Sequence, residues 1–178
     1  MINFKANLHS IGTVQKLDKS NHYTKQQASF VELDTKSKKD LNALERVATS
    51  WKDNIYATDT YYRFKENFFK EQQEYNERFF ALTTQKKGFD KLDHHKILGV
   101  AEIYLPIDED PEIEFLQTNP KFLKKNPKIK HTGKVIIDKI KQILQNKTIS
   151  LYSTYKAIPF YEKQGFKVIE ENLMKLVR

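Results

Sequence analysis

The chain has 178 residues and a formal net charge of +8, with 12 Phe, 9 Tyr, 1 Trp and no Cys. This length fits one domain with a hydrophobic core, and the aromatic content argues against disorder. The absence of cysteine excludes disulfides, thiolate metal ligands and a Cys nucleophile. No apolar run reaches the roughly 20 residues that a membrane-spanning helix needs. Residues 1–5 lack the apolar core of a signal peptide, so we expect a cytoplasmic protein with no membrane partner.

The first half of the chain predicts strands followed by two helices. Alternating apolar and polar residues over 2–17 indicate a strand or hairpin, and the polar residues 18–27 indicate a loop. Ser37, with Asp40 three residues later, is a helix N-cap candidate. The apolar face of the helix that follows comprises Leu41, Leu44, Val47, Ala48, Trp51 and Ile55. The other segments of this half are a strand over 29–33, a helix over 58–76, a strand over 79–83 and a charged loop over 85–95.

The second half predicts shorter elements. Strands are expected over 97–105, 113–118 and 148–153, helices over 132–145 and 157–164, and a final strand or hairpin over 166–169 and 173–177. Residues 119–127 form an irregular connection, and Gly165 is a C-cap candidate. No linker or repeat divides the chain, so residues 1–178 form one domain with residues 1–28 as an N-terminal addition. The order of elements predicts an α/β sheet with helices on both faces.

The positive charge is concentrated in one segment. Residues 121–147 hold nine Lys and one Asp, which equals the net charge of the whole chain. A solvated lysine-rich face is one reading. A nucleic-acid surface is a second, which the absence of Arg and of interleaved aromatic residues in this helix disfavours. A site for a multiply phosphorylated small molecule is the third, and the sequence around residue 130 favours it.

Residues 128–134 predict a phosphate-binding turn. They follow the apolar segment 113–118 and open an amphipathic helix. The first N–H groups of a helix have no internal partner, and the helix dipole adds positive charge there, so a diphosphate can bind. Gly133 would let such a ligand approach the backbone closely.

The histidines do not predict a metal site. They are His9, His22, His94, His95 and His131. Their spacing does not resemble a zinc-binding helix or a His-carboxylate set, so we expect no metal.

Three segments of the last third match known motifs. Residues 116–120 read LQTNP, residues 128–133 read KIKHTG, and residues 157–166 read AIPFYEKQGF. They resemble, respectively, L-x-V-x-P, Q/R-x-x-G-x-G/A and A-x-x-F-Y-E-K-x-G-F. In this order, these motifs resemble the GNAT superfamily of N-acetyltransferases, which use acetyl-CoA.

The resemblance is close over residues 97–170 and follows the order of elements over 29–96. The chain differs at three motif positions, because Thr118 replaces Val, Lys128 replaces Gln or Arg, and His131 replaces the first Gly. The resemblance implies a GNAT-type fold. This is a mixed, mostly antiparallel central sheet flanked by helices on both faces, here with an added N-terminal strand or hairpin.

The resemblance also implies acetyl-CoA as the donor, with direct transfer of the acetyl group to an amine. The strand ending at Thr118 would splay from the strand that contains Leu151, and its unpaired backbone groups would bind the pantetheine arm. In the family, the amide near Leu116 points at the thioester carbonyl. The cofactor-binding residues implied by the motifs are Leu116, Gln117, Thr118, Lys128, Lys130, His131, Thr132, Gly133, Lys134 and Thr154.

Two catalytic residues are expected from the same resemblance. Tyr161 would protonate the departing CoA thiolate. An alkyl ammonium titrates near pH 10 and attack needs the neutral amine, so a base is expected, either Glu112 or a chain of water molecules. Glu114 has the same strand parity as Glu112, so both could face the cleft, and Glu102 is a further candidate.

The acceptor is less well defined by the sequence. Acidic residues gather before the fourth strand of the family fold and along the second predicted helix, at Glu66, Glu71, Glu74, Glu77, Asp108, Glu109, Asp110, Glu112 and Glu114. They predict a cationic amine, such as a polyamine, an aminoglycoside or a basic peptide. One alternative is a non-catalytic acyl-CoA-binding or regulatory domain. Another is transfer onto a large partner, such as a ribosomal protein or a charged tRNA. Residues 1–28 would cover the acceptor cleft or mediate homodimer formation.

Overall fold

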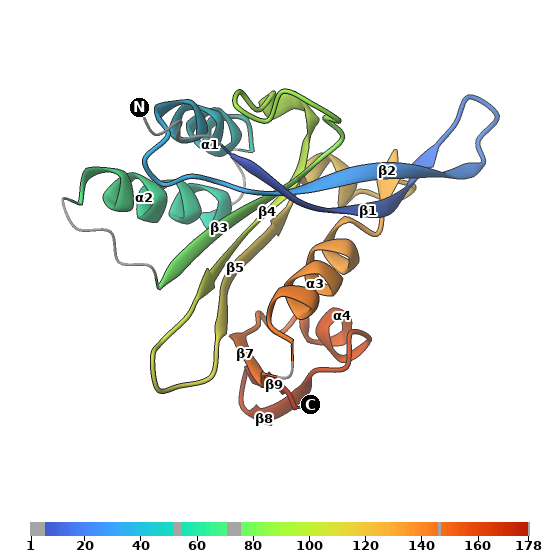
Figure 1. Cartoon of the computed structure of the whole chain (residues 1–178). Coiled ribbons are helices and arrows are strands. Elements are labelled where there is room, and N and C mark those ends of the chain that lie inside the picture. The colour runs from blue at the N-terminus through green and yellow to red at the C-terminus, as the bar shows by residue number, and fades with distance from the viewer. Residues whose placement is uncertain (1–5, 52–54, 71–75, 146, 178) are drawn as a thin grey trace.

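One sheet of nine strands organises the chain (Figure 1). The computed structural model describes residues 6–51, 55–70, 76–145 and 147–177. The strands are β1 (Asn7–Leu17), β2 (Tyr23–Glu32), β3 (Glu77–Thr83), β4 (Ile97–Tyr104), β5 (Glu112–Thr118), β6 (Ile129–Lys130), β7 (Ile149–Tyr152), β8 (Lys167–Glu170) and β9 (Leu173–Leu176). Their order in the sheet is β6-β1-β2-β3-β4-β5-β7-β9-β8. Within the described residues, the β5–β7 pair is parallel and the other pairs are antiparallel.

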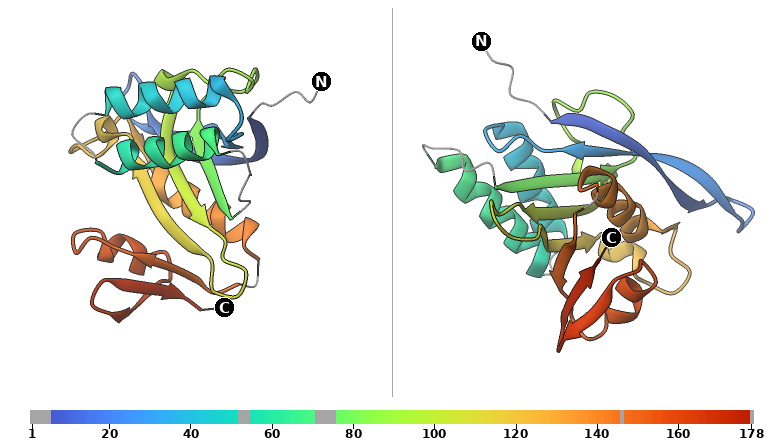
Figure 2. Two further views of the ribbon diagram at one scale, coloured as in Figure 1. Left: turned by 90° about the vertical axis from the view of Figure 1, so that its left-hand side faces the viewer. Right: turned by 60° about the horizontal axis from the view of Figure 1, so that its bottom comes forward.

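Helices cover both faces of the sheet, as the element order predicts (Figures 1 and 2). The helices are α1 (Lys38–Ser50), α2 (Ile55–Phe69), α3 (Thr132–Ile143) and α4 (Ile158–Glu162), with 3-10 turns at His94–Lys96 and Pro120–Phe122. The pair α1 and α2 lies on one face, and α3 and α4 lie on the other. The predicted α/β class and the mostly antiparallel sheet are therefore confirmed.

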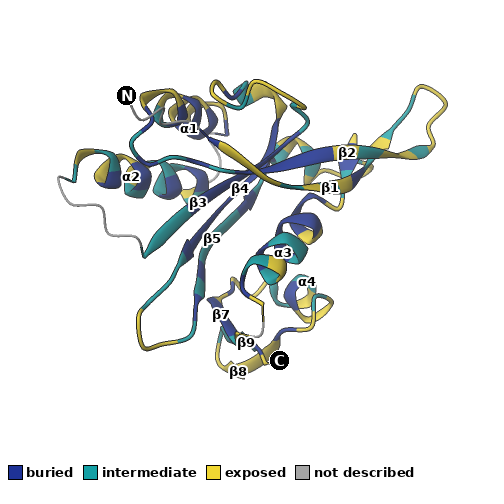
Figure 3. Ribbon diagram, in the orientation of Figure 1, coloured by how far each residue is buried: buried dark blue, intermediate teal, exposed yellow. Residues whose placement is uncertain are grey.

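The sheet separates two hydrophobic cores because successive strand residues point to opposite faces. Phe80 and Leu82 of β3 belong to the core under α3 and α4. Phe79 and Ala81, their neighbours in sequence, belong to the core under α1 and α2. Figure 3 shows the buried residues along the central strands and the exposed ones on the outer helix surfaces and the β1–β2 turn. Both faces of the central strands are thus apolar, which explains their continuous apolar sequences.

The β1–β2 hairpin is longer than the sequence indicates. Residues 23–27, predicted as loop, are the first part of β2 and pair with β1 from Thr13 to Leu17. The boundary proposed after residue 28 lies inside β2, which runs through it. Since β2 pairs with β3 only from Ser29 onward, residues 13–27 extend beyond β3, and we call them the β1–β2 arm (Figure 1). Polarity misled the prediction because residues 23–27 are polar or aromatic and none of them is buried in the core.

Helix α1 begins as its sequence predicts. The Ser37 hydroxyl accepts a hydrogen bond from the Asp40 N–H at 3.2 Å, which satisfies one of the free donors of the first turn. The prediction was wrong about Ile55, which begins α2 instead of ending the preceding helix. The predicted end of that second helix includes Tyr75, which lies outside the described residues.

The far end of α2 is held by a lysine. The Lys36 ammonium donates to the carbonyls of Asn67 at 2.8 Å and Phe68 at 3.3 Å, in the last turn of the helix. A cation at this end also complements the helix dipole. Lys36 thereby fixes the helix that carries Tyr56 and Arg63, two residues of the site described below.

Helix α3 packs unusually close to the sheet. A Cβ on Gly12 of β1 would lie 2.4 Å from Val135 Cγ1, and a Cβ on Gly99 of β4 would lie 2.7 Å from Ile136 Cδ1. Glycine at these two positions is therefore required by the contact with α3. These contacts fix the start of α3 relative to β1 and β4.

The C-terminal elements follow the prediction. The helix α4 is followed by Gly165 with a φ of 91°, a left-handed conformation that glycine adopts without strain. Strands β8 and β9 form an antiparallel hairpin, and β9 pairs with β7. None of the helices described here has the length and apolar character that crossing a membrane requires.

Strands β5 and β7 meet at one end and then diverge. Glu112 pairs with Ser150, and the Ser150 N–H donates to the Pro111 carbonyl at 2.9 Å. No further ladder pair joins the two strands within the described residues. The predicted splay is therefore confirmed, and it leaves the β5 backbone beyond Glu112 open on one side.

Candidate functional site

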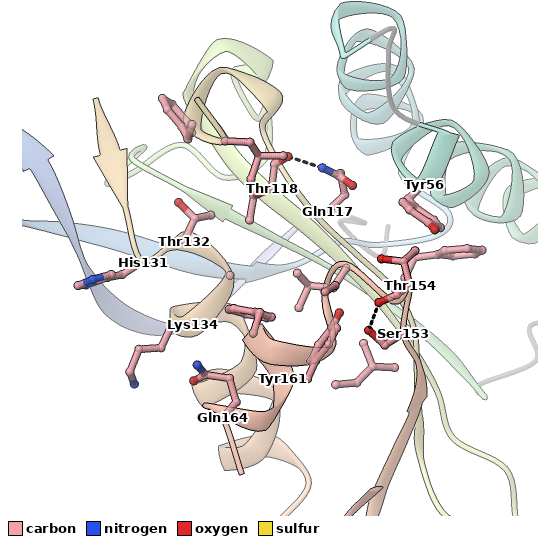
Figure 4. Close-up of a pocket in the computed structure, with 18 of the residues that line it drawn as sticks. Tyr56, Gln117, Thr118, His131, Thr132, Lys134, Ser153, Thr154, Tyr161 and Gln164 are labelled. Carbon is pink, nitrogen blue, oxygen red and sulfur yellow. Dashed lines mark hydrogen bonds between the residues drawn. The ribbon is translucent and has the colours of Figure 1, made fainter. Parts of the chain in front are cut away.

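A cavity of about 820 Å³ opens where β5 and β7 diverge (Figure 4). On what we call its α3 side, it is lined by residues 129–134 and by α4. On its α2 side, it is lined by Tyr56, Glu114 and Phe115. Figure 4 shows Tyr161 between these two sides, with His131 and Lys134 toward one and Tyr56 toward the other. The cavity thus runs across the sheet and connects the two faces.

The α3 side presents a helix start without a side-chain cap. His131 stands at the N-cap position with φ 70° and ψ 11°, and its side chain makes no capping hydrogen bond. The first helical bond runs from the Val135 N–H to the His131 carbonyl. The N–H groups of the preceding residues therefore remain directed out of the helix, where an anion can accept from them.

The Thr132 hydroxyl supports a ligand at this helix start. Thr132 is 4% exposed and lines the cavity, yet its Oγ1 has no hydrogen-bond partner. A buried hydroxyl without a partner costs about 1–3 kcal/mol, so such groups in native proteins call for an explanation. An oxygen-rich ligand in the cavity would supply the missing partner.

Gly133 has a packing role as well as the predicted one. A Cβ at this position would lie 3.0 Å from Phe160 Cζ and 3.5 Å from Thr118 Cγ2. The absent side chain therefore lets α4 approach the first turn of α3. This contact brings Phe160 and the neighbouring Tyr161 up to the cavity.

Lysines on the α3 side are unequally placed. Lys130, Lys134 and Lys163 line the cavity, whereas Lys128 does not. The Lys130 ammonium lies 3.7 Å from the centre of the Tyr23 ring, and Lys134 forms an ion pair with Asp138 one turn along α3. The backbone and these three ammonium groups make the α3 side positive.

Tyr161 is 9% exposed and lies among aromatic rings. Its ring makes edge contacts with Phe160 at 5.0 Å and Phe166 at 5.8 Å between centroids. Burial raises the pKa of Tyr161 to about 12, and nearby Tyr56 adds to the rise. The phenol is therefore protonated at neutral pH and can donate a hydrogen bond into the cavity.

The two carboxylates of β5 differ in their access to the cavity. Glu114 lines it, and Glu112 does not. A β-bulge leaves Glu114 without a cross-strand partner, since Ile113 pairs with Ile103 and Phe115 with Glu102. Bulges re-aim side chains, which explains how Glu114 reaches the cavity wall. Partial burial raises the pKa of Glu112, and the charge of Glu114 adds to the rise.

One arginine of α2 joins the carboxylates of three adjacent strands. Arg63 lies 2.7 Å from Glu102 of β4, 3.3 Å from Glu77 of β3 and 3.5 Å from Glu114 of β5. Its guanidinium also lies 5.7 Å from the centre of the Phe115 ring. Three carboxylates share one cation, so the α2 side of the cavity is acidic.

Glu102 is the most buried member of this cluster, at 0% exposed. Burial raises its pKa to about 8; Arg63 opposes this rise, and the charges of Glu77 and Glu114 add to it. A carboxyl group buried in this way holds a proton near neutral pH.

The structure places ten of the twelve predicted site residues at one cavity. They are Leu116, Gln117, Thr118, Lys130, His131, Thr132, Gly133, Lys134, Thr154 and Tyr161. Lys128 and Glu112 lie outside the lining. The cavity is also lined by four residues that were not predicted, Tyr56, Phe115, Phe122 and Ser153. Tyr56 comes from α2, far from the motifs in sequence, and no motif marks it.

Two solved structures share this architecture. A proposed acetyltransferase of the GNAT family from Desulfovibrio desulfuricans superposes with a TM-score of 0.52 at 12% identity, over 84% of this chain and 95% of the other. A proposed acyl-CoA N-acyltransferase from Klebsiella pneumoniae superposes with a TM-score of 0.50 at 12% identity, over 83% and 95%. No protein-family model and no curated protein matches the sequence. The chain therefore has the fold of the GNAT N-acetyltransferases.

Proposed function

We propose that this protein is an N-acetyltransferase that moves an acetyl group from acetyl-CoA to a primary amine by direct transfer. The observation that carries the proposal is the uncapped start of α3 at the cavity, with the buried Thr132 Oγ1 lacking a partner. A diphosphate accepts hydrogen bonds from such N–H groups and from the hydroxyl. Lys130 and Lys134 add electrostatic attraction.

The splayed strands suit the pantetheine arm of acetyl-CoA. Beyond Glu112, the β5 backbone has no ladder partner on the β7 side, so its N–H and C=O groups are available to amide groups of a ligand. The cavity-lining residues Leu116 to Thr118 belong to this open edge. An N–H near Leu116 would stabilise the oxyanion that forms at the thioester carbonyl, an effect of about 3–4 kcal/mol per donor in other enzymes.

Tyr161 is proposed as the acid. The amine nitrogen forms a bond to the acetyl carbon, the carbon–sulfur bond breaks, and the departing sulfur takes a proton or a hydrogen bond from the phenol. A thiol has a pKa of about 8.5, so complete transfer from the phenol is uphill, and a strong hydrogen bond to the thiolate is the main contribution. The raised pKa of Tyr161 keeps the phenol protonated for this role.

A carboxylate of β5 is proposed as the base that accepts the amine proton. Glu114 is at the cavity wall, and Glu112 would have to act through water from outside the lining. Of the three ion pairs that Arg63 makes, the one with Glu114 is the longest, at 3.5 Å. Glu114 can therefore also pair with an incoming ammonium. Glu114 is therefore the favoured base, with Glu112 as the alternative.

The α2 side favours a cationic acceptor. Glu114 and the nearby Glu77 outnumber the one cation Arg63, while the buried Glu102 holds a proton near neutral pH. The Tyr56 and Phe115 rings, with centroids 6.0 Å apart, add faces that attract a cation. A polyamine, an aminoglycoside or a basic peptide has the required charge.

The cofactor part is tested by replacing Thr132 with Val. Removing the unpartnered hydroxyl should raise the free energy of unfolding of the free protein by about 1 kcal/mol and weaken CoA binding about tenfold. Urea unfolding and calorimetry measure the two effects, and the exposed Thr13→Val is the matched control. Weaker CoA binding together with a more stable free protein would support CoA binding at this site. Unchanged CoA affinity would rule it out.

The catalytic part is tested by thiol release from acetyl-CoA over a panel of amines. A transferase should release thiol only when an amine is present, and polycationic amines should be better substrates than neutral ones. CoA binding without thiol release for any amine would instead assign the chain to the non-catalytic alternative.

A further inference from the structure

A lysine surface extends from the cavity to the β1–β2 arm. Its members are exposed and lie outside the cavity lining; they are Lys16, Lys19, Lys25, Lys121, Lys124, Lys125 and Lys128. None of them forms an ion pair with a residue that the structure describes. By contrast, Lys39, Lys96 and Lys175 pair with Asp90, Asp93 and Asp110. The lysine surface is therefore positive charge without compensation.

The arm and the 119–131 loop form one surface because they are bonded together. The Leu17 N–H donates to the Lys128 carbonyl at 2.9 Å, and the Tyr23 hydroxyl donates to the Pro127 carbonyl at 2.7 Å. Strand β6 also pairs with β1, at Gln15 and Lys16. Figure 1 shows this strand beside the arm, which projects from the body of the sheet. The two segments therefore form one platform. Lys16 pairs with Thr24 and Lys25 with Gln15, so these two lysines project from opposite faces of the arm.

The acidic residue of this platform is already engaged. Asp18, in the β1–β2 turn, accepts hydrogen bonds from the N–H groups of Ser20 at 2.8 Å and His22 at 2.9 Å. The other residues of segments 13–27 and 119–131 are Lys, His, neutral polar or apolar. The acetyl-CoA site does not account for the seven lysines, since the cavity has its own Lys130, Lys134 and Lys163.

We propose that the lysine surface binds the phosphate backbone of a nucleic acid. Lysine is depleted in protein–protein interfaces, where aromatic residues and Arg predominate, so a lysine-rich, carboxylate-poor platform fits phosphates better than a protein. Each phosphate neutralised by a lysine releases counterions, which drives binding. The platform has no Arg for bidentate base contacts, so binding is independent of sequence.

The test uses the full chain and fluorescent nucleic acids of about 20 nucleotides, one single-stranded RNA and one duplex DNA, titrated between about 50 and 200 mM salt. Dissociation constants of about 1–100 μM are expected near physiological salt, with affinity falling steeply as salt rises. The two probes distinguish RNA from DNA as the partner. Binding of either probe by this salt-dependent mode supports the proposal.

A pair of matched variants locates the binding. Lys124→Gln with Lys125→Gln should reduce the slope of log K against log salt by about 1.5, from two lost phosphate contacts. Lys86→Gln with Lys87→Gln removes the same charge from another exposed loop and should leave the slope unchanged. Equal effects of the two pairs would overturn the proposal, because the binding would then reflect net charge alone.

Three further outcomes would also overturn it. Displacement of the nucleic acid by excess CoA would mean that the probe occupies the cavity. Failure of both probes to bind at low salt would rule out nucleic-acid binding by the lysine surface. Retention on anionic phosphatidylserine vesicles with no retention of nucleic acid would assign the surface to a membrane instead.

Discussion

The α3 side and the α2 side of the cavity carry opposite charge by different means. On the α3 side, the positive charge comes from an uncapped helix start and three lysines, with no carboxylate in the described lining. On the α2 side, Glu114 lines the cavity and ionisable side chains provide all the charge, in a cluster centred on Arg63. The β5 strand, which is open toward β7, lies between them.

This difference predicts different responses to mutation. Backbone N–H groups cannot be removed by changing a side chain, so the α3 side should tolerate most single substitutions with small changes in CoA affinity. The α2 side depends on side chains that share protons and charges, so single changes there should alter both amine selectivity and pH dependence.

Replacing Tyr161 with Phe gives the largest effect expected, because Tyr161 lies between the two sides. Loss of the phenol should lower kcat about 10²–10³-fold, while the CoA dissociation constant stays within about twofold. Steady-state thiol release and calorimetry provide the two values. The exposed Tyr155→Phe is the control. A Tyr161→Phe protein with full turnover would show that the ring only packs against Phe160 and Phe166.

Replacing Glu114 with Gln should affect the α2 side alone. Loss of this carboxylate should lower kcat/KM for a polycationic amine about 100-fold, through the lost base and the lost charge, without weakening CoA binding. Glu112→Gln, two residues away and outside the cavity lining, should change kcat/KM less than about tenfold. The pH–rate profiles of both variants provide the comparison. A larger effect of Glu112→Gln would move the role of base to Glu112.

Replacing Arg63 with Met should destabilise the fold in a pH-dependent way. The pKa of Glu102 is raised to about 8 from the usual 4.5, so the folded chain holds its proton more tightly than the unfolded chain. The free energy of unfolding therefore falls as pH rises through this range. The Arg63→Met substitution should lower the free energy of unfolding by about 3 kcal/mol at pH 9, where Glu102 is ionised, and by about 1 kcal/mol at pH 6.

Urea unfolding at the two pH values measures this effect. Glu102→Gln in the Arg63→Met background is the control, because it removes the buried charge and should remove the pH dependence. An equal loss of stability at both pH values would show that Arg63 acts only through packing on Phe115.

Replacing His131 with Gly should give the smallest effect. Glycine adopts the φ of 70° more readily than histidine, so the free energy of unfolding should rise by about 0.5–1 kcal/mol. If the backbone alone holds the diphosphate, CoA affinity should stay within about threefold. Calorimetry measures the CoA affinity of the His131→Gly protein. A tenfold loss of CoA affinity would assign a diphosphate contact to the imidazole.

Much of the fold could be predicted from the sequence because its signals are local. Ser37 with Asp40, Gly165 and the apolar periodicity of α1 and α3 each mark an element directly. Residues 13–17 of the β1–β2 arm were predicted as strand, whereas residues 23–27 were not, because this polar part of β2 has the composition of a loop. The start of α2 at Ile55 was missed since an apolar residue of suitable spacing fits the end of either helix.

The candidate site was also predicted only in part from the sequence. Motif residues from 116 to 161 meet at the cavity because β5 and β7 are neighbours in the sheet and α3 and α4 pack on the same face of it. Tyr56 comes from the opposite face and has no local signal. Strand parity placed both Glu112 and Glu114 at the cleft, but only Glu114 lines it. The bulge at Glu114 is a property of the β4–β5 register, which parity alone does not reveal. The cluster around Arg63 likewise depends on three strands being adjacent.

The bonds between the arm and the loop also have a consequence for biogenesis. The Tyr23 hydroxyl and the Pro127 carbonyl are 104 residues apart in the chain. During synthesis, the N-terminal hairpin therefore leaves the ribosome long before the segment that docks against it. Contacts of such high sequence separation form late and slow folding. The start of α3 should accordingly be among the last parts of the molecule to acquire its native geometry.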